Sequence, residues 1–175
     1  MNVILFLGFS GSGKTTALTS ISSAIRKHHL GKVGSIKRVH EKEFSIDSKG
    51  KDTWLHANSG SSVVVVFAKK ELDVIKKKDT RSVRLDEILQ IFRSSKVDYL
   101  LVEGLHKKFE RMRGVKRIVC AKSESQAMEL MKIHRGQILF CTGRFTVKSK
   151  AKEINGVPVL RLPRDTERAI QMIRS

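Results

Sequence analysis

The chain has 175 residues, of which 40% are hydrophobic and 30% are charged, a size and composition that suit one globular domain. No apolar run approaches the roughly 20 residues of a membrane-spanning helix, and residues 3–7 are too short for the core of a signal peptide. These features argue against a membrane or secreted protein, and we expect a cytoplasmic one.

The charge is strongly basic. The 35 Lys and Arg residues exceed the 17 Asp and Glu residues, giving a formal net charge of +18. Such a field attracts nucleotides, phosphorylated cofactors, RNA or acidic protein surfaces, although a solvated basic face is an equal alternative. Cys120 and Cys141 show neither CxxC spacing nor a disulfide framework. We predict that both are reduced packing residues in strands.

The first elements form a recognisable sequence. Residues 3–7 are an uninterrupted apolar run ended by glycine, which predicts a strand covered on both faces. Residues 14–30 carry apolar side chains at helical spacing and end at Gly31, which is suited to a left-handed helix cap. A strand, a glycine loop and a helix follow one another in the order that a phosphate site requires.

The rest of the chain continues to alternate. The patterns predict a strand at 32–37, a polar loop or hairpin at 38–50, a short helix at 51–59, a buried strand at 62–67, a weak edge strand at 71–75, a helix at 85–92, strands at 99–102 and 115–121, a helix at 123–134 opened by a Ser123-x-x-Gln126 capping box, strands at 137–141 and 156–160, and a terminal helix from 163. This alternation predicts an α/β fold with a mostly parallel sheet and helices on both faces. We expect a single domain over residues 1–175.

The glycine loop carries the strongest motif. The run from Gly8 to Thr15 matches GxxxxGK[ST], in which glycines let backbone N–H groups approach phosphates closely. Lys14 is expected to reach the β- and γ-phosphates as a catalytic residue, and Thr15 to offer its hydroxyl to Mg²⁺. A plain turn with a solvated lysine is the alternative. The fold is therefore predicted to be a three-layer sandwich of the P-loop NTPase type, with these nucleotide-binding residues: Gly8, Ser10, Gly11, Ser12, Gly13, Lys14, Thr15 and Thr16.

A carboxylate for the metal follows another apolar strand. Glu103 comes directly after residues 99–102, so we expect it at the carboxyl edge of the sheet, where ligands bind in open α/β folds. It is the candidate partner of Thr15 in holding Mg²⁺, usually through a water. A surface carboxylate at a strand end is the alternative. Asp98, at the other end of the strand, is expected to cap it.

Three stretches narrow the choice among P-loop proteins. They are Gly34-Ser-Ile-Lys37-Arg38-Val-His40, Phe44-Ser-Ile-Asp47-Ser-Lys-Gly50-Lys51-Asp52-Thr53, and Leu101-Val-Glu103-Gly104. Together they resemble the molybdopterin-guanine dinucleotide biosynthesis protein B family over roughly residues 2–105. The resemblance implies a homodimeric P-loop protein that binds GTP, hydrolyses it weakly, and assists the guanylyltransferase that attaches a guanine nucleotide to molybdopterin in molybdenum or tungsten cofactor biosynthesis.

The resemblance also implies roles for residues outside the glycine loop. Asp52 would be catalytic, orienting the attacking water or the magnesium shell, and a helix-capping role is its alternative. Lys37, His40, Asp47 and Lys51 would belong to a substrate or partner site, with His40 as an ordinary loop histidine in the alternative. The other histidines, His28, His29, His56, His106 and His134, show no metal-ligand spacing in the sequence.

Two departures from the family pattern bear on these roles. Arg38 stands where the family usually has histidine, and the spacing from it to Asp47 is one residue longer. A guanine pocket usually presents an aspartate after a late strand, whereas residues 141–144 read Cys-Thr-Gly-Arg and contain no carboxylate. GTP therefore follows from the resemblance alone, and ATP stays open.

Two other functions compete with this one. A small-molecule or nucleoside kinase using ATP would need arginines that close over the phosphates, for which Arg111, Arg113 and Arg117 are candidates, although a solvated basic turn is favoured. An RNA-binding switch is suggested by the charge, but no basic and aromatic motif accompanies it. In the favoured function the basic surface would meet a pterin phosphate or an acidic partner, and residues 38–50 and 71–75 are candidates for strand pairing in a homodimer.

Overall fold

The computed structural model describes residues 1–41, 43–134 and 136–175. Its contacts group the chain into two compact units. The core unit comprises Met1–Arg38 and Leu85–Ser175, and the hairpin unit comprises Val39–Arg84. A single domain over the whole chain stays a prediction.

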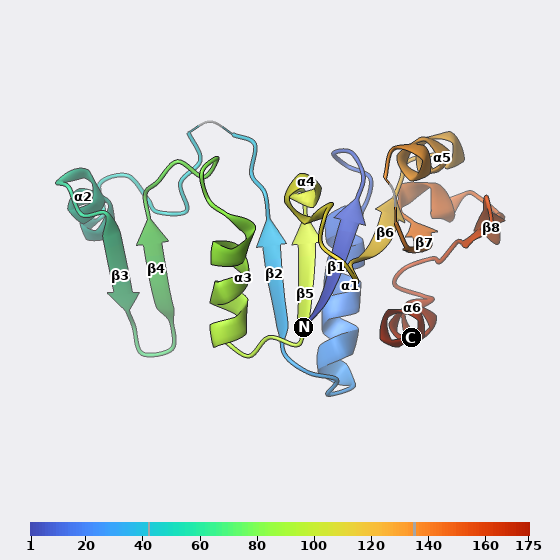
Figure 1. Cartoon of the computed structure of the whole chain (residues 1–175), viewed down its shortest axis with the longest axis horizontal. Coiled ribbons are helices and arrows are strands. Elements are labelled where there is room, and N and C mark those ends of the chain that lie inside the picture. Colours follow the sequence, from blue (N-terminus) through green and yellow to red (C-terminus); the bar gives the residue numbers. More distant parts are fainter. Residues whose placement is uncertain (42, 135) are drawn as a thin grey trace. The chain divides into compact units, whose positions relative to one another are not determined.

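A five-stranded parallel sheet forms the centre of the core unit (Figure 1). Its strands run in the order β2-β5-β1-β6-β7 and pair in parallel throughout. The predicted α/β fold with a mostly parallel sheet is confirmed. The strands are β1 (Asn2–Leu7), β2 (Val33–Lys37), β5 (Tyr99–Glu103), β6 (Lys116–Cys120) and β7 (Ile138–Thr142).

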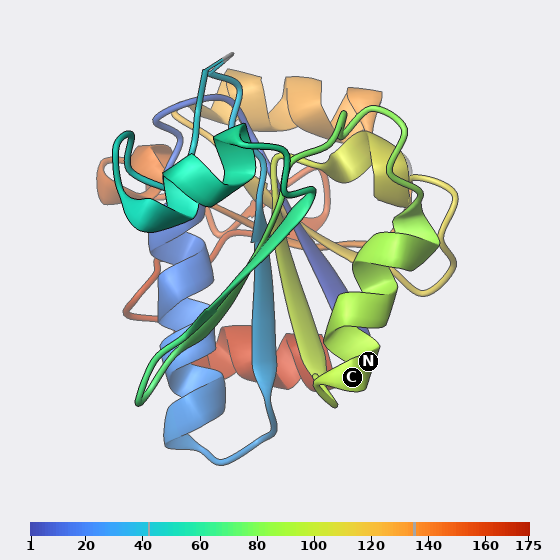
Figure 2. The same cartoon turned by 90° about the vertical axis from the view of Figure 1, so that its left-hand side faces the viewer.

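Helices cover both faces of this sheet, with α1 on one side of the strands and α3 and α4 on the other in Figure 2. Alternate residues of β1 explain why its sequence is apolar throughout. Ile4 and Phe6 pack with α1 (Lys14–Lys27) and α6 (Thr166–Arg174), whereas Leu5 packs with α3 (Leu85–Ser94) and α4 (His106–Phe109). A strand covered on both faces cannot alternate with polar residues.

The last part of the core unit departs from the expected pattern. Helix α5 (Glu124–Ile133) starts as predicted, because Ser123 accepts a hydrogen bond from the Gln126 backbone N–H at 3.2 Å. After η1 (Arg144–Val147), the expected strand at 156–160 is replaced by a small antiparallel pair, β8 (Glu153–Ile154) with β9 (Val157–Pro158). Within the described residues 156–160, Val159 alone forms a parallel bridge to β7, because Val157 and Pro158 pair with β8 instead.

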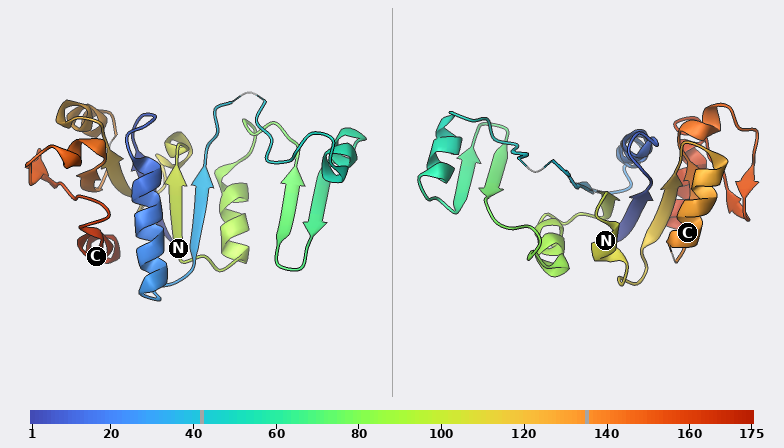
Figure 3. Two further views of the ribbon diagram at one scale, coloured as in Figure 1. Left: turned by 180° about the vertical axis from the view of Figure 1, so that it is seen from behind. Right: turned by 90° about the horizontal axis from the view of Figure 1, so that it is seen from above.

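The hairpin unit holds helix α2 (Asp52–Asn58) and two antiparallel strands, β3 (Val63–Phe67) and β4 (Leu72–Lys76), drawn in Figure 3. The predicted burial of residues 62–67 is wrong. Val63, Val65 and Phe67 are 48%, 57% and 87% exposed, while Val64 is buried. The β-branched run forms a strand, but in a two-stranded sheet only one of its faces is covered.

The loop at 38–50, the two cysteines and the expected lack of a membrane-spanning helix can each be compared with the structure. Described residues 39–41 and 43–51 contain turns and bends without a strand or helix, so the predicted excursion at 38–50 is a loop there. Both cysteines are buried and free, in β6 and β7, and burial raises the pKa of the Cys141 thiol to about 12. Among the described residues, no helix has the length and apolar character needed to span a membrane.

Candidate functional site

The glycine loop lies between β1 and α1 at the carboxyl edge of the sheet. Gly11 and Gly13 have φ angles of 68° and 98°, which side-chain-bearing residues rarely adopt. The first turn of α1 contains no acidic residue, so the partial positive charge of its N-terminus is not offset there. The Lys14 ammonium donates to the Phe9 carbonyl at 2.7 Å. This lysine therefore curls over the loop, where a phosphate group would compete for it.

The segment after β7 packs against the glycine loop. The Arg144 backbone N–H donates to the Ser12 carbonyl at 3.2 Å, and a Cβ added to Gly143 would lie 2.5 Å from both the Ala121 and Ser12 carbonyl oxygens. Gly143 is thus required for the close approach of the two loops. Sequence reasoning assigned it no role, although a glycine directly after the apolar strand at 138–142 is the signal that could have found it.

Glu103 joins two neighbouring strands and the glycine loop. Its carboxylate accepts from the Thr15 hydroxyl at 3.0 Å and from the Lys37 ammonium at 2.8 Å, and the residue is only 8% exposed. Strand register explains the contact with Lys37, because β2 pairs with β5 so that the two residues stand side by side. A threonine hydroxyl and a carboxylate are oxygen ligands of the kind that Mg²⁺ prefers, so these residues fit the ion.

These residues surround a cavity of about 460 Å³. Lys14, Lys37 and Arg144 line it, with Glu103 as the single carboxylate among the described lining residues. The excess of cations favours a phosphate group. The other lining residues come from the glycine loop, the first turn of α1, the segment after β7 and the C-terminal segment: Ser10, Gly11, Gly13, Thr15, Thr16, Ala17, Thr142, Gly143, Thr146, Val147 and Leu162.

Two of the predicted nucleotide-binding residues, Gly8 and Ser12, are not among the described residues that line this cavity. Ser12 is fully buried, and its hydroxyl has no hydrogen-bond partner within the described part of the chain. A Cβ on Gly8 would stand 2.1 Å from the Cys120 carbonyl oxygen, so this glycine is needed where the loop leaves β1. Both residues shape the loop, and a direct contact of either with a nucleotide stays a prediction.

The remaining predicted site residues belong to the hairpin unit. Asp47 accepts from the Thr53 hydroxyl at 2.7 Å, which fastens the loop to the first turn of α2. Asp52 is the first residue of that helix rather than its cap, since Lys51 occupies the capping position without a side-chain hydrogen bond. The side chains of His40, Lys51 and Asp52 are exposed. Of the predicted substrate or partner set, Lys37 alone belongs to the core unit.

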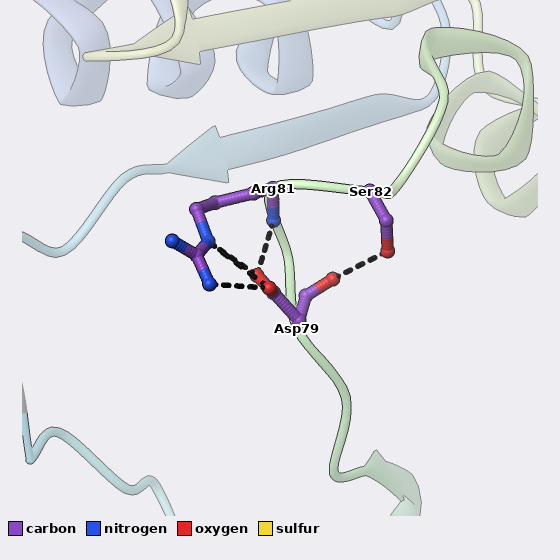
Figure 4. A network of polar contacts seen from close by, with 3 residues as sticks. All are labelled: Asp79, Arg81 and Ser82. Carbon is purple, nitrogen blue, oxygen red and sulfur yellow. Dashed lines mark hydrogen bonds and ion pairs between the residues drawn. The ribbon is translucent and has the colours of Figure 1, made fainter.

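One arginine of the basic segment at 69–84 is paired locally, as Figure 4 shows. The Arg81 guanidinium holds both carboxylate oxygens of Asp79 at 2.8 to 3.0 Å, and the Ser82 hydroxyl donates to the Asp79 carbonyl at 2.8 Å. The arginine lowers the pKa of the Asp79 carboxyl. These exposed side chains stabilise a turn, and their geometry indicates no binding site.

The arginines considered as a kinase lid do not act together. Arg117 is buried near the start of β6, where its guanidinium donates to the Val115 carbonyl at 3.0 Å. Because it is held inside the unit, it is unsuited to closing over phosphates. Arg111 and Arg113 are exposed in the turn after α4. This arrangement agrees with the alternative of a solvated basic turn.

Comparison with known proteins adds a family to this geometry. The family model for molybdopterin guanine dinucleotide synthesis protein B matches residues 3–140. A molybdopterin-guanine dinucleotide biosynthesis adapter protein of Haemophilus influenzae is 37% identical over 97 residues, which cover 55% of this chain and 53% of that protein. A putative adapter protein of Methanocaldococcus jannaschii is 27% identical over 139 residues, covering 79% and 55%. The chain thus spans about half the length of these relatives.

Solved structures agree in fold. The crystal structure of Bacillus subtilis MobB superposes with a TM-score of 0.74 at 19% identity, covering 98% of both chains. A MobB homologue from Bacillus stearothermophilus gives a TM-score of 0.69 at 21% identity over 99% of both chains. At these identities the likeness concerns the fold alone.

Proposed function

This chain belongs to the molybdopterin guanine dinucleotide synthesis protein B family, and on that premise we propose that it is a GTP-binding adaptor in molybdenum or tungsten cofactor biosynthesis. It would assist the guanylyltransferase that attaches a guanine nucleotide to molybdopterin, in the cytoplasm. The observation that carries the proposal is the convergence of Lys14, Thr15 and Glu103 on one cavity at the carboxyl edge of the sheet.

The cavity supports the binding of a magnesium nucleotide. Backbone N–H groups at the start of α1 and the Lys14 ammonium would receive the phosphates. The Thr15 hydroxyl and the Glu103 carboxylate would hold Mg²⁺, which neutralises charge on the phosphate oxygens when bound. Lys37 would keep the carboxylate in place through its ion pair with Glu103.

Hydrolysis is proposed to be weak. Glu103 is the single carboxylate among the described residues that line the cavity, and it is already engaged by Thr15 and Lys37. A carboxylate held in this way is poorly placed to orient an attacking water as a general base. Asp52 could do so if the hairpin unit supplied it, as the family resemblance implies. Slow turnover suits an adaptor, whose task is to present a nucleotide or a partner.

The choice of GTP rests on the relatives, whose names refer to a guanine dinucleotide. The cavity lining contains no aspartate in its described residues, so the base is not selected by the carboxylate contact common in guanine pockets. Backbone groups after β7, in the segment of Thr142, Gly143 and Arg144, would have to contact the base instead. ATP remains the alternative nucleotide.

The partner surface is proposed to include the exposed end of the family motif. The Thr53 hydroxyl donates a hydrogen bond to the Asp47 carboxylate, so these two side chains satisfy each other. Lys51 and Asp52 at the start of α2, and His40 in the preceding loop, are exposed and available to a partner. The charge of +18 favours an acidic partner surface or the phosphate of molybdopterin. Both partner classes would bind less tightly as salt rises.

A homodimer is proposed to form through the hairpin unit. One face of the β3 and β4 pair exposes an apolar surface, and both strands have unpaired edges within their two-stranded sheet. An exposed apolar strand pair is a template for pairing with another chain, and a second copy offers the same surface for a symmetric contact. The face consists of Val63, Val65, Phe67, Leu72 and Val74, each 48% exposed or more.

A co-purification experiment tests this function. The tagged chain should retain a molybdopterin guanylyltransferase on a column in the presence of GTP and Mg²⁺. Lys14→Ala, which removes the phosphate ligand without touching the core, should stay folded by circular dichroism and lose nucleotide binding by roughly 100-fold. Recovery of RNA without the enzyme, or tight nucleotide binding by the variant, would overturn the proposal.

A further inference from the structure

Two histidines and a glutamate meet in the core unit on side chains that the nucleotide site does not use. His106 opens helix α4, Glu110 follows one turn later, and His134 caps the end of α5. One ligand atom from each residue lies within 4.8 Å of those of the other two. The imidazole rings of His106 and His134 are arranged edge to face, with centroids 4.8 Å apart and an angle of 81°.

The three side chains line a cavity of about 270 Å³. Leu5 and Leu7 of β1 form part of its lining, together with Ile133 and Arg117. This cavity shares no lining residue with the one around the glycine loop. Both histidines are half-buried, whereas Glu110 is exposed and therefore free to move.

The surroundings keep the imidazoles in the form that binds metal. Burial lowers the pKa of His106 and of His134 below the ordinary value, and each histidine also feels an opposing influence from the Glu110 carboxylate. Neutral imidazole has a lone pair to offer, whereas imidazolium has none. Arg117 acts against a cation near His134, as Lys107 and Arg38 do near His106, and the Arg117 guanidinium is held by the Val115 carbonyl at 3.0 Å.

We propose that His106, Glu110 and His134 form a binding site for a divalent transition-metal ion, with Zn²⁺ as the best match. Two imidazole nitrogens and one carboxylate oxygen are the protein ligands of open zinc sites, which leave a fourth position for water or another ligand. Donors bound to one zinc ion lie about 3.4 Å apart, so the present separations of up to 4.8 Å would shorten by at most about 1.4 Å. The exposed Glu110 side chain can move toward the imidazoles, and the two imidazole nitrogens can approach each other by rotation of their own rings.

A bound ion would connect two helices that follow different strands of the sheet. Helix α4 follows β5, whose last residue is Glu103, and α5 connects β6 to β7. The ion would therefore hold α4, which follows β5, against the C-terminal end of α5. The site does not depend on the proposed GTP function, because its residues are separate from the glycine loop.

Cobalt titration of the chelator-treated full chain tests the proposal, because Co²⁺ reports a protein site through its visible absorption. One equivalent should bind per chain and be displaced by Zn²⁺. His106→Gln and His134→Gln should each weaken cobalt binding by roughly 10-fold or more, and Glu110→Gln should do so as well. Circular dichroism and thermal melting of the three variants will show whether they remain folded.

Three matched controls separate this site from others. His56→Gln removes an exposed histidine of α2 and should leave cobalt binding unchanged. Lys14→Ala and Glu103→Gln disturb the nucleotide site and should also bind cobalt as the unaltered chain does. The proposal would be overturned if folded His106→Gln and His134→Gln variants bound cobalt as tightly as the unaltered chain, or if Glu103→Gln alone lost cobalt binding.

Discussion

Glu103 shows how much depends on one side chain in this protein. It is buried at the end of β5 and accepts hydrogen bonds from both Thr15 and Lys37. The sequence indicated its place, because a carboxylate after an apolar run lies at the sheet edge. Its pairing with Lys37 could not be predicted, since that contact requires β2 and β5 to be neighbours, and strand order is not encoded in local pattern.

Replacement of Glu103 by glutamine should distinguish the contribution of Mg²⁺ to nucleotide affinity from that of the phosphate contacts. Glu103→Gln keeps the shape but removes the charge that favours Mg²⁺, so the magnesium-dependent part of nucleotide affinity should fall by roughly 10-fold or more. Isothermal titration with and without Mg²⁺ measures this. Glu153→Gln, at an exposed residue of β8, is the matched control and should change nothing. Equal magnesium dependence in both variants would refute the metal role.

At the scale of elements, two loops rather than one build the phosphate site. Gly143 lets the segment after β7 lie against the glycine loop, and its φ angle of 117° is unfavourable for other residues. Gly143→Ala should lower the free energy of unfolding by about 2–4 kcal/mol, because strain and a backbone clash add. Urea denaturation checks this value.

Gly156 provides the control for that substitution. It also has a positive φ angle, 76°, but a Cβ there would meet nothing within 4 Å. Gly156→Ala should therefore cost only the backbone strain, about 1–2 kcal/mol. If both variants lost the same stability, the close approach of the two loops would not be the reason for glycine at 143.

The elements themselves were predictable to different degrees. Strands β1, β5, β6 and β7 were found because long apolar runs mark strands buried on both faces. The run at 62–67 looks the same in sequence, yet β3 pairs only with β4 and exposes alternate residues. Periodicity reports the tendency to form a strand and not what covers it. His106, Glu110 and His134 were likewise unrecognisable as a group, because α4 and α5 bring them together.

At the scale of the whole molecule, the exposed face of the hairpin unit predicts self-association. Phe67 is 87% exposed, so Phe67→Lys should not disturb the folded chain. If each copy buries Phe67 in the dimer, the symmetric pair would lose about 4 kcal/mol, which is roughly 1000-fold in the dimer dissociation constant. Sedimentation velocity should show monomers.

The control for this change is Ile91→Lys, which adds the same charge at an exposed apolar residue of α3 in the core unit. It should leave the dimer intact. A Phe67→Lys variant that remains as dimeric as the unaltered chain would place the interface elsewhere.

The central claim is a magnesium-dependent GTP site in the cavity of Lys14, Thr15 and Glu103. The most direct measurement is competition of unlabelled GTP and ATP against a fluorescent guanine nucleotide in the presence of Mg²⁺. We predict that GTP displaces the probe at least roughly 10-fold more effectively than ATP, a difference of about 1.4 kcal/mol, and that the Lys14→Ala variant binds the probe roughly 100-fold more weakly. Displacement by ATP as effective as by GTP, or a probe that binds the variant unchanged, would contradict the account.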